Sequence, residues 1–498
     1  MSNPVDHDDD VSEAGVLRDL HRQPHLFLRL AQNALTVADS LRNNYFKNTA
    51  SFVKELRRAV VMFEKGQRPD CILRTHDVTD ASWSEFQSEV VTFIDGGVGE
   101  VKISSQVPLL LRVGSYCVRT GEKRVREREQ FGYYPVILGD IEGGSKERKD
   151  FIDIVRITAE LLGGLSALQR TPDLRVLMFH GPLVYLVGSY TGHRPFTEHD
   201  IDLFLHQYAS DPELAKSLKA GFLQEAKLDI YPQMIPEHAD DWVAQRVFEP
   251  VAWMSFLYRR LVAEARQRKP AVLVAGVVER GELRDFSERV LLERVFRGLR
   301  AKDKAGYFNT LFGRSDLASP KSLLDQLGYT DALLLAMLMK VGQASEPWEM
   351  RKYDGLRHAE VAVPGKPGKT VVNFDPLRSG KIGFPVVDGA YLHVSQTTEL
   401  IRIEVFAGDD NAEMLEVLRR CFLYAKLLPG YGFPVGLDIV DKYAHVPDWL
   451  TNAYGKLIRH HLGVSLQRGE VKDDEMRKIL VQAIYMTNRD WLFRPTVQ

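Results

Sequence analysis

The chain has 498 residues, of which 45% are hydrophobic and 27% are charged, and its formal net charge is -2. This composition is typical of a soluble, globular protein. The length exceeds one ordinary hydrophobic core, so the chain forms either several domains or one large domain with insertions. Because the charges nearly balance, any contact with a nucleic acid must come from a local basic patch or from a ring of several subunits.

The three cysteines, Cys71, Cys117 and Cys421, lie far apart in the sequence, and none of them forms a CxxC pair. This spacing excludes a disulfide framework and a zinc knuckle, and it fits a reducing cytosol. The acidic N-terminus lacks the basic and apolar regions of a signal peptide. No apolar run approaches the length that spans a membrane. We therefore expect a cytoplasmic protein with no membrane partner.

Hydrophobic periodicity divides the chain into four parts. A disordered acidic tail precedes an N-terminal helical region, which leads into an α/β core with a long helical insertion, and helices close the chain. The expected bounds are residues 1–15, 16–85, 86–445 with the insertion at about 195–385, and 446–498.

The core begins with a β-branched and aromatic run, Val90–Ile94, which predicts a strand that ends at the turn signal Asp95-Gly96-Gly97. The glycine pair Gly163-Gly164 interrupts a helix further on and indicates close packing or an early helix end. The elements expected between these points and beyond are strands at 108–118 and 134–138, a helix at 151–168, and a buried strand at 175–179 that ends at His180.

Strands and helices continue to alternate through the rest of the core. We expect strands at residues 271–278, 391–395 and 400–406, a charged helix at 284–300, and further helices after residue 413. A Gly/Pro/Lys loop at 363–369 and a turn at 429–434 separate some of these elements.

Four candidate site residues follow from the order of the elements. The first strand ends in Asp95, the next helix carries Glu160, the following strand ends in His180, and a late helix offers Asp441. This order suits an α/β fold with an RNase H-like mixed sheet, in which acidic side chains from these positions converge on metal ions. Such a centre hydrolyses phosphodiesters, because divalent cations neutralise the phosphate and activate water. Carboxylates are the ligands that Mg²⁺ and Mn²⁺ prefer.

Each of these residues also has a purely structural interpretation. An Asp-Gly pair such as the one at Asp95 usually forms only a turn. A glutamate on the polar side of a helix, such as Glu160, is usually solvated. His180 can belong to an ordinary turn, and Asp441 can lie on the surface. Their combined order favours the metal centre, whereas no single residue does.

The same residues resemble motifs of the NurA nuclease family, in the family's order over about residues 90–445. Phe93–Gly97 is similar to the first motif, a strand ending in Asp-Gly, and Val176–Leu183 to the second, a strand ending in Asp-Gly-x-Leu. Residues 274–278 resemble the family's apolar strand, and Asp331 with residues 342–345 resembles its Asp before a Gly-x-x-Ser turn. Residues 400–404 resemble its Arg-Val-Glu strand, and residues 432–437 with 441–444 resemble its closing Tyr-Pro-x-x-Leu segment.

The resemblance implies an RNase H-like core and a Mn²⁺-dependent nuclease that trims DNA ends, with Mg²⁺ as an alternative metal. It also implies a homodimer docked on a HerA-type hexameric ATPase that translocates DNA, in DNA repair or in antiviral defence against phage. By position, Asp95 matches the metal ligand of the first motif, and Glu160 matches a helix Glu before the second motif. Asp441 matches the late-helix position, where the family often has His.

One residue departs from the family pattern, because the second-motif Asp is His180 in this chain. Neutral imidazole binds Mn²⁺ but is softer and uncharged, which favours Mn²⁺ over Mg²⁺ and weakens a two-metal site. Two functions therefore remain open. The first is an active Mn-dependent DNA exo- or endonuclease, which the presence of Asp95 and Glu160 favours. The alternative is a catalytically attenuated DNA-binding clamp or adaptor subunit of the same complex.

Several basic side chains near the core are candidates for DNA contact: Arg124, Arg126, Arg128, Lys366 and Lys369. Acidic residues alternate with the three arginines, so a solvated hairpin is the alternative for that stretch. The two lysines lie on or near a Gly/Pro loop, for which a plain surface loop is the default.

Two acidic residues outside the four main candidates have a second interpretation. Asp200 either replaces the missing carboxylate or completes the acidic first turn of a helix capped by Thr197, and we favour the cap. Glu404 either reaches the site or pairs with Arg402 on the same strand, and we favour the pair.

Overall fold

The structure of this chain is a computed structural model. It describes residues 21–22, 24–65, 73–101, 109–124, 129–133, 136–138, 145–183, 198–208, 212–225, 250–298, 305–306, 309, 319–350, 358–362, 367, 369–373, 384–408, 412–428 and 430–485. The chain divides into two compact units, residues 1–73 with 287–329, and residues 74–286 with 330–498. The acidic tail expected at residues 1–15 lies outside the described residues.

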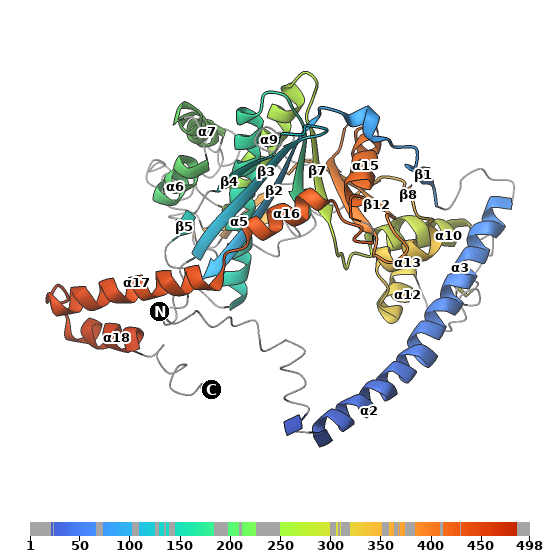
Figure 1. The fold of residues 1–498 in the computed structure, drawn as a ribbon, viewed down its shortest axis with the longest axis horizontal. Helices are drawn as coiled ribbons and strands as arrows, with labels where there is room; N and C mark the ends of the chain where they lie inside the picture. The colour runs from blue at the N-terminus through green and yellow to red at the C-terminus, as the bar shows by residue number, and fades with distance from the viewer. Residues whose placement is uncertain are drawn as a thin grey trace. The chain divides into compact units, whose positions relative to one another are not determined.

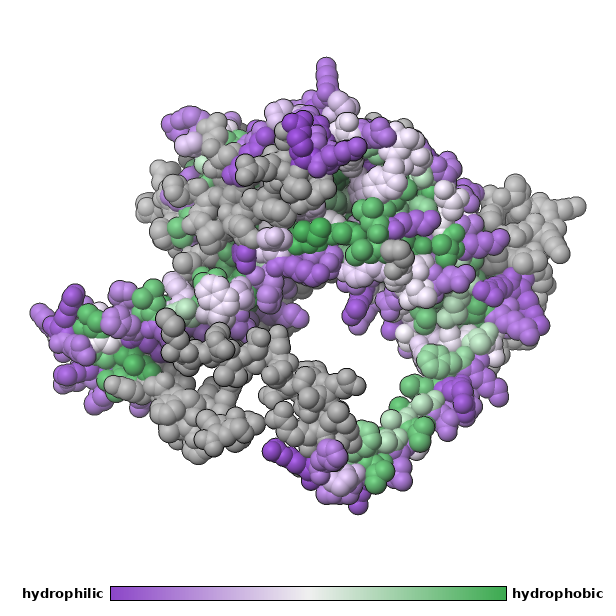
Figure 2. Space-filling view, viewed as in Figure 1, coloured by the Kyte–Doolittle hydropathy of each residue, from purple (hydrophilic) through white to green (hydrophobic). Residues whose placement is uncertain are grey.

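The first unit is helical where it is described. Its elements are α2 (Pro24–Ser40), the π-helix η2 (Leu41–Phe46), α3 (Lys47–Lys65), the π-helix η5 (Ser287–Leu292), α10 (Glu293–Gly298) and α12 (Pro320–Leu327). The charged helix expected at 284–300 is present as η5 and α10. Tyr329 is buried in this unit, and its hydroxyl donates to Thr49 Oγ1 at 2.9 Å. No residue of α2 is buried, and Figure 2 shows apolar side chains gathered along this helix.

An eleven-stranded mixed sheet forms the centre of the second unit (Figure 1). Its main path runs β1-β8-β12-β13-β7-β6-β2-β3-β4, while β5 pairs with β3 and β9 pairs with β12. The strands are β1 (Thr75–Asp77), β2 (Val90–Glu100), β3 (Leu109–Arg119), β4 (Glu129–Tyr133), β5 (Val136–Leu138), β6 (Leu174–His180), β7 (Leu273–Val278), β8 (Gln343–Ser345), β9 (Trp348–Glu349), β12 (Val387–Leu392) and β13 (Ile401–Phe406). A separate hairpin joins β10 (His358–Ala362) to β11 (Lys369–Asn373).

The three central strands β2, β6 and β7 run parallel to one another, and the other paired strands are antiparallel. Parallel strands are covered on both faces, so their sequences are continuous apolar runs instead of alternating ones. Every residue of β7 is buried accordingly, and so is every residue of β2 from Val90 to Gly96. The central strands therefore run through a dry environment, where a charged side chain is costly unless it is paired.

Helices cover this sheet on both faces. The described helices of this unit are α5 (Ser145–Arg170), α6 (Glu198–Tyr208), α7 (Pro212–Glu225), α9 (Pro250–Gln267), α13 (Asp331–Leu338), α15 (Ala412–Ala425), α16 (Val435–Ala444), α17 (Asp448–Gln467) and α18 (Asp474–Tyr485). Both α5 and α16 pack against β2 and β3, and Figure 1 shows α16 lying across these strands. Among the described residues, no helix combines the length and the apolar character needed to cross a membrane.

Consecutive residues of β2 place α5 and α16 on opposite faces of the sheet. A Cβ added at Gly96 would lie 2.7 Å from Glu160 Oε1 of α5, whereas a Cβ added at Gly97 would lie 2.0 Å from the Ala444 carbonyl oxygen of α16. Because side chains alternate along a strand, Asp95 faces the same side as Gly97, towards α16. The two glycines thus allow both helices to approach one strand closely.

The expectation that the first strand ends at Asp95 is wrong. β2 continues to Glu100 and stays paired with β3 throughout, from Val90 opposite Arg119 to Glu100 opposite Leu109. The glycines that suggested a turn are required by the close approach of the two helices. Similarly, the glycine pair in α5 does not end that helix, because Gly163 packs against Val113 and Gly164 against Phe179.

Other elements agree with the sequence to within a few residues, with some exceptions. The strand expected at 391–395 lies earlier, at Val387–Leu392, and the strand expected at 134–138 is the short β5, preceded by β4. The strands β1, β4, β8, β9, β10 and β11 are not among those expected from the sequence. They are short, and β1 and β8 are held by partners more than 250 residues apart in the sequence, Thr75 with Ser345, so no local pattern indicates them.

We predict that Gly97→Ala destabilises the protein by about 2 kcal/mol or more, because the new methyl group would collide with the backbone of α16 and overpacking of this kind strains the fold. Urea unfolding followed by circular dichroism measures the change. Gly463→Ala is the matched control, since a Cβ at this position in α17 meets no atom within 4 Å and alanine is the better helix former. An unchanged midpoint for Gly97→Ala would contradict the described packing.

Candidate metal centre

Asp95 is buried, with 4% of its surface exposed, at the point where the sheet changes its pairing. β2 pairs with β6 only as far as Ile94 opposite Phe179, and β6 ends at His180, while β3 continues beside β2. The Asp95 carboxylate accepts a hydrogen bond from the Gly96 N–H at 2.9 Å. The sheet therefore fixes this carboxylate at the open end of a neighbouring strand.

His180 lies beside Asp95 at the end of the parallel neighbour β6. Its Nδ1 is 3.6 Å from Asp95 Oδ1, and its ring packs edge-on against Phe433, with the ring centroids 5.5 Å apart. Burial lowers the pKa of His180 below its usual value, although the charge of Asp441 acts in the opposite direction. The imidazole is therefore neutral at neutral pH, which is the form that binds a metal ion.

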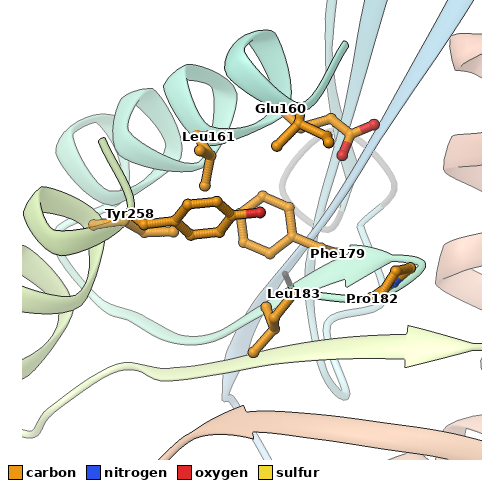
Figure 3. A pocket seen from close by; sticks show the side chains of 8 residues that line it. Glu160, Leu161, Phe179, Pro182, Leu183 and Tyr258 are labelled. Atoms are coloured by element: carbon orange, nitrogen blue, oxygen red, sulfur yellow. The ribbon is translucent and has the colours of Figure 1, made fainter. Parts of the chain in front are cut away.

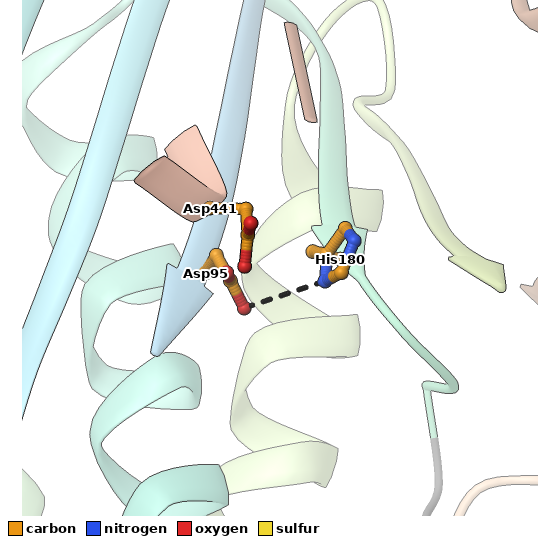
Figure 4. Close-up of side chains that lie close together, drawn as sticks. All are labelled: Asp95, His180 and Asp441. Atoms are coloured by element: carbon orange, nitrogen blue, oxygen red, sulfur yellow. Dashed lines mark ion pairs between the residues drawn. The ribbon is translucent and has the colours of Figure 1, made fainter. Parts of the chain in front are cut away.

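Asp441 completes a group of three ligands. It is an exposed residue of α16, the helix that the glycines of β2 bring close to the sheet. One ligand atom from each of Asp95, His180 and Asp441 lies within 4.8 Å of the other two. Figure 4 shows the three side chains converging from β2, β6 and α16. Two carboxylates and one imidazole form a donor set that suits Mn²⁺.

Glu160 lies next to this group but is not a member of it. Its buried carboxylate lies against Gly96 and accepts a hydrogen bond from Arg156 Nη1 at 3.0 Å. It also lines a small cavity between α5, α9 and the end of β6, with room for about one water molecule. Figure 3 shows Glu160 at the wall of this cavity, opposite Pro182 and Leu183. Burial raises the pKa of Glu160, and Arg156 opposes this shift.

The electrostatics of the group favour a bound cation. Burial raises the pKa of Asp95, and the negative charges of Glu160 and Asp441 raise it further. Arg156 is the nearby positive charge, and it lowers the pKa of Asp95 by less than Glu160 or Asp441 raises it. A divalent cation stabilises the ionised form of neighbouring carboxylates. The ionised side chains of this group would therefore be more stable with a bound metal ion than without one.

An open pocket of about 340 Å³ adjoins the centre. It is lined by residues of β2, the end of α16 and the following turn: Asp95, Gly96, Gly97, Val98, Asp441, Lys442, Ala444, His445 and Val446. The pocket contains two of the three ligands, and Gly96 and Gly97 add no side chains to it. A substrate group can therefore reach the carboxylates from solvent.

Arg156 is a residue of this centre that the sequence did not single out as a site residue. It lies four residues before Glu160 and three after Asp153, and its guanidinium is 3.5 Å from Asp153 Oδ1. These are the spacings at which side chains of one helix face meet. The spacing was visible in the sequence, but only the burial of Glu160 shows that the pair stabilises a buried charge.

Of the basic candidates for DNA contact, Arg124 alone has a described side chain, and it is not among the residues that line the pocket at the centre. Arg124 is exposed, and its Nε lies 3.7 Å from Glu122 Oε1. Arg126, Arg128 and Lys366 lie outside the described residues, and the side chain of Lys369, the first residue of β11, also lies outside them. Their role in DNA binding stays a prediction.

The two remaining acidic candidates lie elsewhere. Asp200 is buried near the start of α6 and is not in the ligand group, and Thr197 lies outside the described residues. Glu404 and Arg402 form the expected pair, with 2.9 Å between Oε1 and Nε. The favoured interpretation of Glu404 as a structural partner is thus confirmed for the pairing itself.

A family profile described as the NurA domain matches residues 89–446. The search of curated proteins gave no match. Among solved structures, the chain is similar to the NurA nuclease from Sulfolobus solfataricus, with 12% identity, a TM-score of 0.42, and 85% of this chain and 98% of that chain covered. It is also similar to NurA bound to dAMP and manganese, with 11% identity, a TM-score of 0.39, and 84% and 94% covered.

The matched segment contains every member of the centre. It begins just before β2, includes Glu160 and His180, and ends two residues after α16, the helix that carries Asp441. It covers well over half of the chain. The chain therefore belongs to the NurA family.

Proposed function

We propose that the protein is a nuclease that hydrolyses phosphodiester bonds of DNA with Mn²⁺ held by Asp95, His180 and Asp441. The observation that carries this proposal is the convergence of three ligand atoms within 4.8 Å, from elements far apart in the sequence. Membership of the NurA family supports the same reaction. The donor set favours Mn²⁺ over Mg²⁺, because one ligand is an imidazole.

The proposed roles follow from the positions of the side chains. When bound, the metal neutralises charge on the phosphate and lowers the pKa of a bound water. Asp95 and Asp441 hold the metal with oxygen atoms, and neutral His180 holds it with a ring nitrogen. Glu160 is the third carboxylate of the proposed centre, and Arg156 fixes its orientation. The open pocket beside Asp95 and Asp441 is the proposed place of the sugar-phosphate backbone.

We also propose that the core is RNase H-like. The strand order β4-β3-β2-β6-β7 supports this, with β2 antiparallel to β3, and β2, β6 and β7 mutually parallel. In such a sheet the first and fourth strands of the core lie side by side, which is the arrangement of β2 and β6. Their ends carry Asp95 and His180.

The proposed biological role is DNA end processing in repair or antiviral defence, as a homodimer that acts with a HerA-like ATPase. Family membership supports this assembly. The exposed apolar face of α2 is a candidate surface for it, because large side chains such as Leu28, Leu30 and Leu35 are 58–69% exposed. Contiguous apolar patches on a soluble protein often mark interfaces.

We predict that Asp95→Asn lowers Mn²⁺-dependent DNA cleavage by at least about 100-fold, because it removes a charged ligand from the centre. The rate of nucleotide release from a labelled DNA duplex measures the effect. Asp173→Asn is the matched control, since that carboxylate pairs with Arg119 at the opposite end of the same strands. Cleavage that survives in Asp95→Asn would remove Asp95 from the mechanism.

The substitution His180→Asp should lower the ratio of the cleavage rate with Mn²⁺ to that with Mg²⁺, because an oxygen ligand replaces the softer nitrogen. Parallel assays in the two metals measure the ratio. A second outcome is that the natural chain fails to cleave DNA with every divalent metal tested while the His180→Asp variant cleaves it. In that case the protein is the attenuated clamp instead of an active nuclease. An unchanged metal ratio would show that His180 is not a ligand.

The metal-free protein should lose stability relative to Asp95→Asn as the pH rises. The folded-state pKa of Asp95 is raised by burial and by Glu160 and Asp441, so its ionisation opposes folding above its unfolded pKa of about 4. In EDTA, we expect the Tm of Asp95→Asn to exceed that of the natural chain by a few degrees, more at pH 8 than at pH 5.

Calorimetry with and without Mn²⁺ completes this test. Mn²⁺ should raise the Tm of the natural chain more at pH 8 than at pH 5, because the ligands must be deprotonated, and should raise that of Asp95→Asn little. A Tm difference between the two proteins that stays constant with pH would show that the pKa of Asp95 is not raised in the folded protein.

A further inference from the structure

The turn that follows His180 is anchored to two other strands. Gly181, with a φ of +98°, donates its N–H to the Val277 carbonyl of β7 at 2.8 Å. Leu183 donates its N–H to Glu404 Oε2 of β13 at 2.9 Å. Figure 3 shows Pro182 and Leu183 just beyond the end of β6. The turn therefore crosses β7 to reach a strand that is not adjacent to β6.

The crossing is possible because β7 carries a glycine at this position. Gly276 pairs with Glu404 on one side and with Phe179 on the other. A Cβ at Gly276 would lie 2.7 Å from the Leu183 nitrogen and 2.8 Å from the Gly181 carbonyl oxygen. Any side chain here would push the turn away from β7 and from the Glu404 carboxylate.

Glu404 is the charged group that receives the turn. It is fully buried, with 0% exposed, and it accepts one hydrogen bond from Arg402 Nε through Oε1 and one from Leu183 through Oε2. A buried carboxylate is costly unless its oxygens are hydrogen-bonded. Arg402 balances its charge at Oε1, and Oε2 accepts from the backbone N–H three residues after His180. Groups outside the ligand set commonly orient metal ligands, and this carboxylate holds the backbone three residues after His180 instead of the imidazole itself.

We propose that Glu404 is a positioning residue, which sets the place of His180 in the metal centre through the Leu183 N–H. The inference rests on the proposed function, since it assumes that His180 binds Mn²⁺. It adds to that function the buried residue Glu404, which lies two strands away from β6. In this proposal Glu404 contacts neither the metal nor the substrate. Gly276 contributes to the same positioning, because its missing side chain allows the turn after His180 to pass over β7 and reach Glu404.

Mn²⁺ affinity, measured on the full chain by isothermal titration with Mn²⁺ alone, tests the proposal. We expect Glu404→Gln to raise the Kd for Mn²⁺ at least about tenfold, because the neutral amide cannot serve both donors. In a His180→Ala background the same substitution should change the Kd by less than about twofold, since its effect passes through His180. A merely structural role would weaken binding by the same factor in both backgrounds, which overturns the proposal.

Gly276→Ala provides a second route if Glu404→Gln does not fold. It keeps the carboxylate and Arg402 but displaces the turn, so the same dependence on His180 is expected. Gly221→Ala is its control, because a Cβ there makes only an ordinary contact with Phe256 at 3.5 Å. An unchanged Kd in Gly276→Ala overturns the positioning role. If the natural chain itself neither binds Mn²⁺ nor cleaves DNA, the proposed function fails as well, which is a different result.

Discussion

The candidate centre depends on one close backbone contact, between Gly97 of β2 and the last turn of α16. At this point the Ala444 carbonyl occupies the space of a missing side chain. The same helix is held further along by Gly436, which packs against the ring of Phe93. These two contacts fix both the distance and the rotation of α16 on the sheet. Asp441, three residues before Ala444, is thereby directed towards Asp95.

Charge is distributed unevenly around this contact. Three carboxylates gather near the end of β6, two of them buried. Arg156 is paired with two acidic side chains of its own helix, Asp153 and Glu160. By contrast, the buried Arg420 elsewhere in the same unit is matched by Glu89 and Glu416 at hydrogen-bond distance. The charge of Arg420 is matched within the protein, while the three carboxylates of the centre have Arg156 as their nearby cation and form the group that a bound metal ion would stabilise.

Much of the site could be predicted from the sequence, because its ligands lie at the ends of elements with strong local patterns. The apolar runs before Asp95 and His180 identified both strands, and the stripe of α5 identified the helix of Glu160. The end of β2 could not be predicted, because the two glycines are required by the close approach of α5 and α16, which are distant in the sequence. The anchoring of the turn after His180 was equally hidden, because Glu404 lies 221 residues from Leu183.

Neighbouring positions of β2 have incompatible requirements, and this protects the centre against a shift of register. Asp95 needs the face that α16 covers, and Gly97 on that face must stay bare, while Gly96 leaves the opposite face free for Glu160. A slip by one residue would exchange the two faces of the strand. It would drive the carboxylate into the buried side of α5 and leave the β-branched Val98 against the backbone of α16. The chain thus rejects a misaligned strand by steric exclusion, before any metal ion is needed to select the correct one.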